Sequence, residues 1–471
     1  MDFEVWPEAI ELGQLFAEQG FELALVGGPV RDLLLRRPSH DLDFCTSARP
    51  EEFEPILHKW GQGFWDMGRK FGTLGALRRR SDGTEVKVEV TTYRSDSYQP
   101  NSRKPEVNYG SSLEGDLSRR DFTVNAMALR VPDLEFVDPF GGANDLAKKM
   151  LRTPVDPHQS FDDDPLRMMR AVRFVAQLDF RIALSTAEAL SQMTDRITIV
   201  SAERVRDELI KLLTSEHPHQ GVEALVDSGL AAYVLPEIPA LQLQIDEHHR
   251  HKDVYEHSLM VLDRAVALET GPDGPVPAPD LTLRLAALLH DIGKPSTRRF
   301  ESGGKVSFHH HDLVGAKIAR KRLKALHFDK HITDDVCDLI AMHLRFHGYV
   351  DERWSDAAVR RYAKETGPLF ERLNCLTRAD ATTRNKLKAH NFSAAMDELE
   401  DRVRQLKEKE NFDAIRPDLN GQQIMEILDL EPGPLVGKAY QHMLDYRLDE
   451  GPVDQETACA ELKAWWAQQQ V

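Results

Sequence analysis

Residues 25–44, LVGGPVRDLLLRRPSHDLDF, constrain the fold of this chain more than any other segment. A short apolar run ends in Gly27 and Gly28, a helical pattern follows, and Asp41 and Asp43 then alternate with apolar residues, as in a half-buried strand. Glycines at a strand-to-helix junction let the backbone approach an anion, and the free N–H groups of the following helix favour one there. The segment therefore predicts a strand–helix–strand unit with an anion cradle at the glycines.

Charged side chains around this unit predict a metal–phosphate site. Arg31 follows Gly28 by three residues, which places a guanidinium near the same anion. Asp41 and Asp43 lie on one face of a strand, where two carboxylates are costly unless a cation joins them, and hard oxygen ligands suit Mg²⁺. Two such ions can activate a hydroxyl and hold a triphosphate. A Gly-Gly turn or an Asp-x-Asp pair alone is common, so the prediction depends on their combination.

A third carboxylate is expected on a later strand. Glu89, in the alternating segment VKVEVTTYR, is the candidate, and Glu85 is the neighbour that could take its place. The alternative for Glu89 is an ordinary outward-facing strand residue.

The remaining pattern predicts a head of α/β type with a helical second half. Helices are expected over 7–19, 29–37, 49–60, 160–178 and 201–213, and strands over 21–28, 40–44, 73–80 and 84–94. Residues 95–112 are poor in apolar side chains and predict a polar, mobile loop. The Pro/Gly-rich segment 271–280 predicts a loop between helices.

Composition predicts a soluble, cytoplasmic protein of two to four domains. The 471 residues include 41% hydrophobic side chains, no stretch long and apolar enough to span a membrane, and an acidic N-terminus unlike a signal peptide. The four cysteines are scattered, which fits a reducing cytosol. The net charge of -17 argues against a nucleic-acid partner unless one face is basic. The basic run Lys317–Lys330 is either such a face or a solvated helix surface.

Several further motifs follow the Gly-Gly and Asp-x-Asp segment in a fixed order. They are RRDFTVNAM (119–127), DPFGGANDL (138–146), DDPLRMMRAVRF (163–174) and SAERVRDEL (201–209). Together they resemble the motifs of the class II tRNA nucleotidyltransferase and bacterial poly(A) polymerase family, over roughly the first half of the chain. Two positions depart from that pattern, since the family often has Gly at Arg36 and Glu at Asp163.

The resemblance implies a polymerase-β-like head with a mixed sheet, in which Asp41, Asp43 and Glu89 are catalytic and the first two hold Mg²⁺. The nucleotide-binding residues that it implies or that the local pattern predicts are Gly27, Gly28, Arg31, Arg120, Asp121, Asn125, Asp164, Arg167, Arg170 and Arg173. For Asn125, a capping or packing role is the alternative.

The spacing within 163–174 suggests how such a protein chooses a base. Asp164, Arg167, Arg170 and Arg173 recur every three residues and are expected on one helix face. A carboxylate accepts the exocyclic amine of cytosine or adenine, and a guanidinium donates to the ring acceptor beside it. Uracil and guanine present the opposite order and would leave polar groups unpaired. The resemblance assigns base recognition to Asp164 and Arg167 and phosphate contacts to Arg170 and Arg173; surface ion pairs are the alternative.

The second half resembles the HD superfamily of metal-dependent phosphohydrolases. His257, His290, Asp291 and Asp380 match its four metal ligands, and His311 and His343 match histidines that some members add for a second metal. A His-Asp pair inside an apolar helix is hard to explain as core packing, and imidazole with carboxylate suits a transition metal. The alternative is a degenerate domain that only helps to hold RNA.

The expected parts are a head (1–155), a helical neck for base recognition and RNA binding (156–245), an HD domain (246–385) and a helical C-terminal region (386–471). The expected activity is addition of CCA to tRNA from CTP and ATP. The polar loop at 95–110 matches the position of a flexible loop that helps the resembled family to switch from C to A addition, so the resemblance disfavours addition of CC alone. The alternatives are a poly(A) polymerase on the same scaffold, an HD phosphohydrolase with a binding-only head, and a structural RNA-binding protein. Gly72 and Thr73, and a C-terminus without a basic extension, favour CCA addition over poly(A) synthesis.

Overall fold

The computed structural model describes residues 5–38, 41–97, 106–109, 112–242, 253–301, 306–351, 353–382, 385–410 and 416–469. The chain forms two compact units, residues 1–240 with 325–328, and residues 241–324 with 329–471. The division into four parts at residues 155, 245 and 385 remains a prediction. Among the described residues, no helix combines the length and apolar character needed to cross a membrane.

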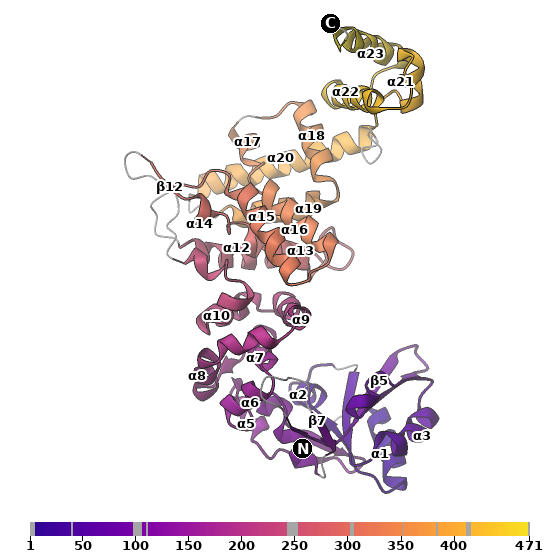
Figure 1. Ribbon diagram of the computed structural model, residues 1–471, viewed down its shortest axis with the longest axis vertical. Coiled ribbons are helices and arrows are strands. Elements are labelled where there is room, and N and C mark those ends of the chain that lie inside the picture. The colour runs from indigo at the N-terminus through magenta and orange to yellow at the C-terminus, as the bar shows by residue number, and fades with distance from the viewer. Residues whose placement is uncertain are drawn as a thin grey trace. The chain divides into compact units, whose positions relative to one another are not determined.

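A seven-stranded mixed sheet forms the head of the first unit (Figure 1, indigo). Its strand order is β3-β4-β5-β2-β1-β8-β9, and β2 and β5 are its parallel pair. The strands are β1 (Leu23–Val26), β2 (Asp41–Thr46), β3 (Gly63–Trp65), β4 (Thr73–Arg79), β5 (Glu85–Thr92), β8 (Ala128–Val131) and β9 (Glu135–Val137). The expected mixed-sheet head is therefore confirmed. The strands β1, β2, β4 and β5 lie at the predicted positions, whereas β3, β8 and β9 were not predicted.

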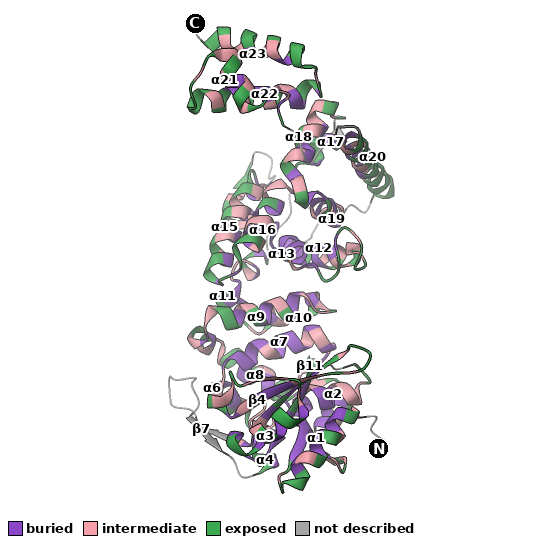
Figure 2. Cartoon of the chain, turned by 90° about the vertical axis from the view of Figure 1, so that its right-hand side faces the viewer, coloured by how far each residue is buried: buried purple, intermediate pink, exposed green. Residues whose placement is uncertain are grey.

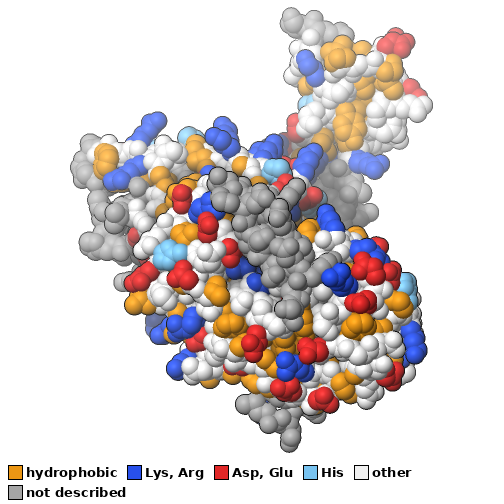
Figure 3. Space-filling model, turned by 60° about the horizontal axis from the view of Figure 1, so that its bottom comes forward, with side chains coloured by type: hydrophobic (Ala, Val, Ile, Leu, Met, Phe, Trp, Pro, Cys, Tyr) orange, Lys and Arg blue, Asp and Glu red, His pale blue; other side chains and the backbone are white. Residues whose placement is uncertain are grey.

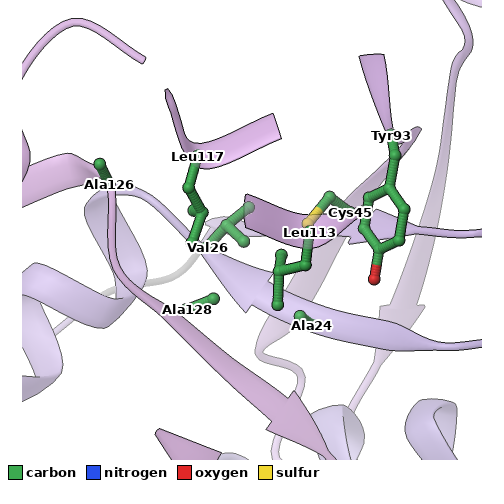
Figure 4. Close-up of a cluster of buried hydrophobic side chains, with 8 residues drawn as sticks. All are labelled: Ala24, Val26, Cys45, Tyr93, Leu113, Leu117, Ala126 and Ala128. Carbon is green, nitrogen blue, oxygen red and sulfur yellow. The ribbon is translucent and has the colours of Figure 1, made fainter. Parts of the chain in front are cut away.

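Helices cover the head sheet on both faces. α1 (Pro7–Glu18) and α3 (Pro50–Trp60) pack on one face, where Phe16 and Phe53 meet with ring centroids 5.9 Å apart. α4 (Leu113–Ser118) packs on the other face, over small residues of β1 and β8 and over Cys45 and Tyr93 (Figure 4). Cys45 follows Asp43 by two residues, so the β2 carboxylates point to the same face as this cluster.

The segment expected to be a loop contains a hairpin. β6 (Arg94–Ser97) pairs with β7 (Glu106–Tyr109) in an antiparallel ladder. The prediction of an irregular loop is wrong for these strands, because backbone pairing gives order that composition does not reveal. Residues 98–105 and 110–111 of the proposed loop lie outside the described part of the chain.

Beyond the sheet, the first unit is mainly helical. Its other helices are α2 (Gly28–Leu34), α5 (Gly142–Ala147), α6 (Pro157–Asp163), α7 (Leu166–Leu178), α8 (Leu184–Gln192), α9 (Ala202–Leu213), α10 (Pro218–Asp227) and α11 (Ala231–Val234). β10 (Met150–Leu151) and β11 (Arg181–Ile182) add a short parallel pair. α7 packs against α9 and α10, and much of its surface is buried (Figure 2).

The helix expected over 160–178 is broken at Asp164. Asp164 has extended dihedrals, φ -142° and ψ 97°, and α7 begins after Pro165. A proline ring disfavours helical geometry in the residue before it, so Asp164 leaves α6. The expectation that Asp164 shares a helix face with the three arginines is therefore wrong, although the arginines themselves lie on α7.

The second unit is helical apart from a hairpin of β12 (Arg299–Phe300) and β13 (Val306–Ser307). Its helices are α12 (Val254–Leu268), α13 (Leu281–Leu289), α14 (Lys294–Thr297), α15 (His311–Ala325), α16 (Lys330–Met342), α17 (His347–Asp351), α18 (Asp356–Thr366), α19 (Phe370–Asp380), α20 (Lys386–Glu410), α21 (Gly421–Leu428), α22 (Pro434–Glu450) and α23 (Gln455–Gln469). α12, α13, α16 and α19 pack together, and α21–α23 enclose a separate small core.

Candidate functional site

The anion cradle forms where β1 meets α2. Gly27 has a left-handed φ of 75°, which a residue with a side chain rarely adopts. A Cβ built there would come within 2.9 Å of Nη1 of Arg120. The missing side chain thus lets the Arg120 guanidinium lie directly against the backbone, next to the glycines at which the sequence pattern predicted an anion.

Three exposed carboxylates lie together on β2 and β5. In the parallel ladder Asp43 is the register partner of Glu89, and Asp41 precedes Asp43 by two residues. Glu85, the alternative to Glu89, instead pairs with Arg79 on β4. The geometry therefore places Glu89 rather than Glu85 beside the two aspartates.

Electrostatics show that these carboxylates face one another. Restricted solvation raises the pKa of Asp43 to about 6, Glu89 and Asp41 add to the rise, and Arg120 opposes it. Clustered carboxylates of this kind are stabilised by a divalent cation with oxygen preference. The donor set therefore fits Mg²⁺.

Two buried aspartates bind three arginines of the site. Asp116, fully buried, binds Arg119 (2.9 Å) and Arg120 (3.1 Å). Asp121 accepts from Nε of Arg170 (2.7 Å) and from Nδ2 of Asn125 (2.9 Å). Burial alone would raise the pKa of Asp121, but these partners hold it below its ordinary value.

Asn125 extends this network to the cradle. Its side-chain oxygen accepts from Nη1 of Arg31 at 2.8 Å, while Asp32 accepts from Nε and Nη2 of the same arginine. Asn125 therefore links Asp121 to Arg31, which is a bridging role beyond helix capping.

Asp164 and Arg167 lie at the start of α7 with constrained side chains. Oδ1 of Asp164 accepts from the backbone N–H of Leu166 (3.1 Å), and Oδ2 lies 3.4 Å from Arg204. Arg167 is 7% exposed and donates to Ser160 and to the carbonyl of Arg119. Both side chains are held in place before any ligand binds.

Arg173 lies in the site and forms an ion pair with Glu208. Its Nε faces the buried carboxylate of Glu208, and its guanidinium lies 4.0 Å from the ring centroid of Phe174. Burial lowers the pKa of Arg173, and Glu208 opposes that effect. Glu208 thus holds the Arg173 guanidinium in position.

These groups line one cavity of about 390 Å³, a size suited to a small ligand. Its lining comprises Gly27, Gly28, Arg31, Asp43, Arg119, Arg120, Asp121, Asn125, Asp164, Leu166, Arg167, Arg170, Arg173, Phe174, Gln177 and Arg204. The cavity brings together all ten nucleotide-binding residues expected from the sequence. Asp41 and Glu89 lie beside Asp43 and outside this lining. The arginines outnumber the aspartates, so the cavity favours a polyanion.

Sequence reasoning did not assign five of the lining residues a role. Arg119 and Arg204 lie inside the motifs at 119–127 and 201–209, so those motifs already pointed to them. Leu166, Phe174 and Gln177 lie at helical spacing from Arg170, four residues before it and four and seven after it, on the same face of α7. Helical spacing could therefore have pointed to them once the arginines were assigned to the site.

A second cluster of charged and imidazole side chains lies in the second unit, at the ends of helices. His257 Nε2 lies 2.9 Å from Oδ1 of Asp380, His290 Nε2 lies 3.2 Å from Oδ2 of Asp291, and His311 joins Asp291 at 3.3 Å. Two groups could each hold a metal ion, His257 with His290 and Asp291, and Asp291 with His311 and His343. All four predicted ligands and both added histidines therefore converge.

Three of the histidines are oriented by backbone carbonyls. Nδ1 of His290, His311 and His343 lies 2.9, 2.8 and 2.6 Å from the carbonyl three residues earlier, which turns Nε2 of each into the cluster. Nε2 of His343 is buried and has no hydrogen-bond partner among the described residues. A metal ion would satisfy that nitrogen, so the residues fit a metal centre.

Comparison with known proteins identifies three families along the chain. Residues 23–152 match the model of the poly A polymerase head domain, 179–241 the model of the probable RNA and SrmB-binding site of polymerase A, and 254–385 that of the HD domain. The first and third matches contain the cradle with its carboxylates and the histidine cluster, respectively.

Curated relatives match the N-terminal half. The CCA-adding enzyme of Pediococcus pentosaceus is 40% identical over 221 residues, which are 47% of this chain and 53% of that protein. The CCA-adding enzyme of Geobacillus thermodenitrificans is 40% identical over 228 residues, 48% of this chain and 54% of that protein. The chain thus spans about half the length of the curated relatives that it matches.

Solved structures extend the similarity to the whole fold. The Bacillus stearothermophilus CCA-adding enzyme in complex with CTP covers 99% of both chains with a TM-score of 0.69 and 25% identity. The Thermotoga maritima CCA-adding enzyme complexed with tRNA covers 98% of this chain and 96% of that one, with a TM-score of 0.62 and 19% identity. The second similarity concerns the fold alone.

Proposed function

We propose that this chain, which belongs to the CCA-adding tRNA nucleotidyltransferase and poly(A) polymerase family and carries an HD domain, adds CCA to the 3′ end of tRNA from CTP and ATP. The observation that carries the proposal is the head cavity. It joins a metal-binding carboxylate, a backbone anion cradle and a constrained Asp164–Arg167 pair in one space.

The site residues have separate roles in the in-line transfer of the nucleotide. Gly27, Gly28 and Arg120 bind the triphosphate, and the carboxylates of Asp41, Asp43 and Glu89 would hold magnesium. Bound magnesium would lower the pKa of the tRNA 3′-hydroxyl and neutralise the developing phosphate charge. The hydroxyl attacks the α-phosphorus, and pyrophosphate leaves.

Asp121 keeps Arg170 and Asn125 in place, so the site is organised before the nucleotide binds. Arg170 and Arg173 are proposed to contact phosphate while keeping their buried carboxylate partners.

Base choice is assigned to Asp164 and Arg167. The carboxylate of Asp164 accepts the exocyclic amine of cytosine or adenine, and Arg167 donates to the adjacent ring nitrogen. Uracil and guanine place a ring N–H against those donors, which leaves polar groups unpaired at about 1–3 kcal/mol each. A cavity of fixed shape can therefore select two bases without a template.

The direct test uses a tRNA transcript that lacks its CCA end, with Mg²⁺ and purified protein. Two C residues from CTP alone, and a terminal A only when ATP is also present, are expected on sequencing the 3′ ends. Long A tails from ATP alone would show a poly(A) polymerase instead. No extension under any condition would contradict the transferase proposal and favour a head that only binds RNA.

A second activity is proposed for the histidine cluster. Asp291 belongs to both groups that could hold a metal ion, and Asp380 lies 2.9 Å from His257, so the proposed core ligand set for a transition metal is His257, His290, Asp291 and Asp380. Imidazole and carboxylate donors of this kind suit a metal-dependent phosphohydrolase acting on RNA ends. Elemental analysis of the purified protein should find a transition metal that is lost in Asp380→Asn; metal-free wild-type protein that cannot be loaded would contradict this.

We also propose the division into head, neck, HD domain and C-terminal region, and a cytoplasmic location. The family matches to the head, the following RNA-binding segment and the HD domain support the division. The location follows from the proposed substrates.

A further inference from the structure

Ser160 contacts Arg167 although seven residues and a helix break separate them. It lies on α6, is fully buried, and its Oγ accepts a hydrogen bond from Nη1 of Arg167 at 2.8 Å. Its backbone carbonyl accepts from the same nitrogen at 3.2 Å. Ser160 does not line the head cavity, so its contact with a ligand would run through Arg167.

The hydrogen bonds to Ser160 fix the orientation of the Arg167 guanidinium. A guanidinium has five N–H hydrogens in a fixed plane. Nη1 donates to both the hydroxyl and the carbonyl of Ser160, and Nη2 donates to the carbonyl of Arg119. Among the described residues Nε has no acceptor, so its hydrogen and the second Nη2 hydrogen remain for a ligand. The contacts of Nη1 and Nη2 fix the plane of the guanidinium and therefore the direction of these donors.

The remaining donors match the proposed bases. Cytosine offers a ring nitrogen and a carbonyl side by side as acceptors, and adenine offers a ring nitrogen; uracil and guanine place an N–H at the corresponding ring position. A guanidinium free to rotate could present other donor edges to a carbonyl of uracil or guanine. Discrimination between the bases therefore requires a fixed orientation of the Arg167 guanidinium, and not only the presence of the arginine.

We propose that Ser160 is a positioning residue for nucleotide specificity, which fixes the guanidinium plane of Arg167 so that only cytosine and adenine are accepted. The inference rests on the proposed function, since it assigns a role within CCA addition. It predicts a selective effect: loss of the Ser160 hydroxyl impairs discrimination more than it impairs incorporation of the correct nucleotide.

The test compares wild type with Ser160→Ala on the tRNA transcript that lacks CCA, measuring kcat/KM for CTP and UTP separately. We expect the CTP-to-UTP ratio to fall by about tenfold, the size of one hydrogen bond to a charged group. Ser160→Thr, which keeps the hydroxyl, should restore the ratio. Equal losses for both nucleotides, or an unchanged ratio, would overturn the proposal.

Two controls separate positioning from folding. Thr366→Val removes another buried hydroxyl, one that donates to the carbonyl of Ala363, and should leave the ratio unchanged. In an Arg167→Lys background, Ser160→Ala should have no further effect on the ratio, because the residue it positions is gone; an additive effect would contradict a role through Arg167. Wild-type protein that adds neither C nor A would refute the proposed function itself, which is a distinct outcome.

Discussion

At the scale of single residues, the raised pKa of Asp43 should make the stability of the metal-free protein depend on pH. The pKa of Asp43 is raised to about 6, so the folded protein binds a proton more readily than the unfolded chain between about pH 4 and pH 6. The metal-free protein should therefore lose stability as pH rises through this range. Asp43→Asn should raise the Tm of the metal-free protein at pH 7.5 while it abolishes nucleotide addition.

The matched control for this prediction is Glu85→Gln. Glu85 lies on β5 as Glu89 does, but pairs with Arg79, so its replacement should not raise the Tm. Added Mg²⁺ should stabilise wild type and Glu85→Gln, and stabilise Asp43→Asn much less. Equal stabilisation of all three by Mg²⁺ would place the metal elsewhere.

The raised pKa of His290 predicts that metal binding to the histidine cluster releases protons. Burial lowers the pKa of His290, but Asp291 and Asp380 outweigh burial and raise it to about 10. Since a metal ligand must be neutral, binding at pH 7 displaces this proton, and affinity should increase with pH. Calorimetric titration of metal-free protein with Zn²⁺ in buffers of different ionisation enthalpy measures the protons released. Release of none would contradict the assignment of His290 as a ligand.

At the scale of elements, the histidine cluster depends on a close approach between the turn after α13 and the start of α15. A Cβ at Gly293 would come within 2.0 Å of the carbonyl of His311, which is backbone and cannot move aside easily. Gly293→Ala should separate His311 from Asp291 and lower both metal content and Tm. Gly271→Ala, with no atom within 4 Å of the added Cβ, should change neither. Full metal content in Gly293→Ala would contradict this account.

The break between α6 and α7 is a second element whose geometry can be tested. Pro165→Ala would permit helical geometry at Asp164 and turn its carboxylate from the position it now has beside Arg204. We expect kcat/KM for both CTP and ATP to fall by about tenfold or more, the loss of one charged hydrogen bond, with a small change in Tm. Unchanged kinetics would show that the orientation of Asp164 is not set by this break.

The elements also show what sequence pattern alone could and could not predict. The strand–helix–strand unit around Gly27 and Asp43 was predictable, because periodicity and glycine placement are local. The pairing of Asp43 with Glu89 depends on strand register, which local pattern leaves open between Glu89 and Glu85. The hairpin of β6 and β7 was missed for the same reason, since its order comes from pairing.

At the scale of the molecule, the net charge of -17 must be reconciled with the proposed RNA substrate. On the face shown in Figure 3, basic and acidic side chains are interspersed. α15 differs: it is buried along the face from His311 to Leu323, and Lys317, Lys321 and Lys324 are exposed. The lysines of the basic run are therefore accessible to phosphate, but a solvated helix surface would look the same, so both interpretations stay open.

Lys317→Glu with Lys321→Glu tests whether this helix binds tRNA. We expect weaker tRNA binding and a salt-dependence slope that is smaller by about one for each phosphate that the helix no longer neutralises. Lys386→Glu with Lys388→Glu on α20 makes the same charge change on another exposed helix and should alter the slope less. Identical slopes in both double variants and wild type would show that α15 is only a solvated surface.

The most direct test of the central claim compares two isosteric variants on the tRNA transcript that lacks CCA, with CTP, ATP and Mg²⁺. Asp43→Asn alters the head cavity, and Asp380→Asn alters the histidine cluster. The account predicts that sequencing of the 3′ ends finds complete CCA with wild type and Asp380→Asn, and no extension with Asp43→Asn. Complete CCA from Asp43→Asn would contradict the assignment of nucleotide addition to the head cavity.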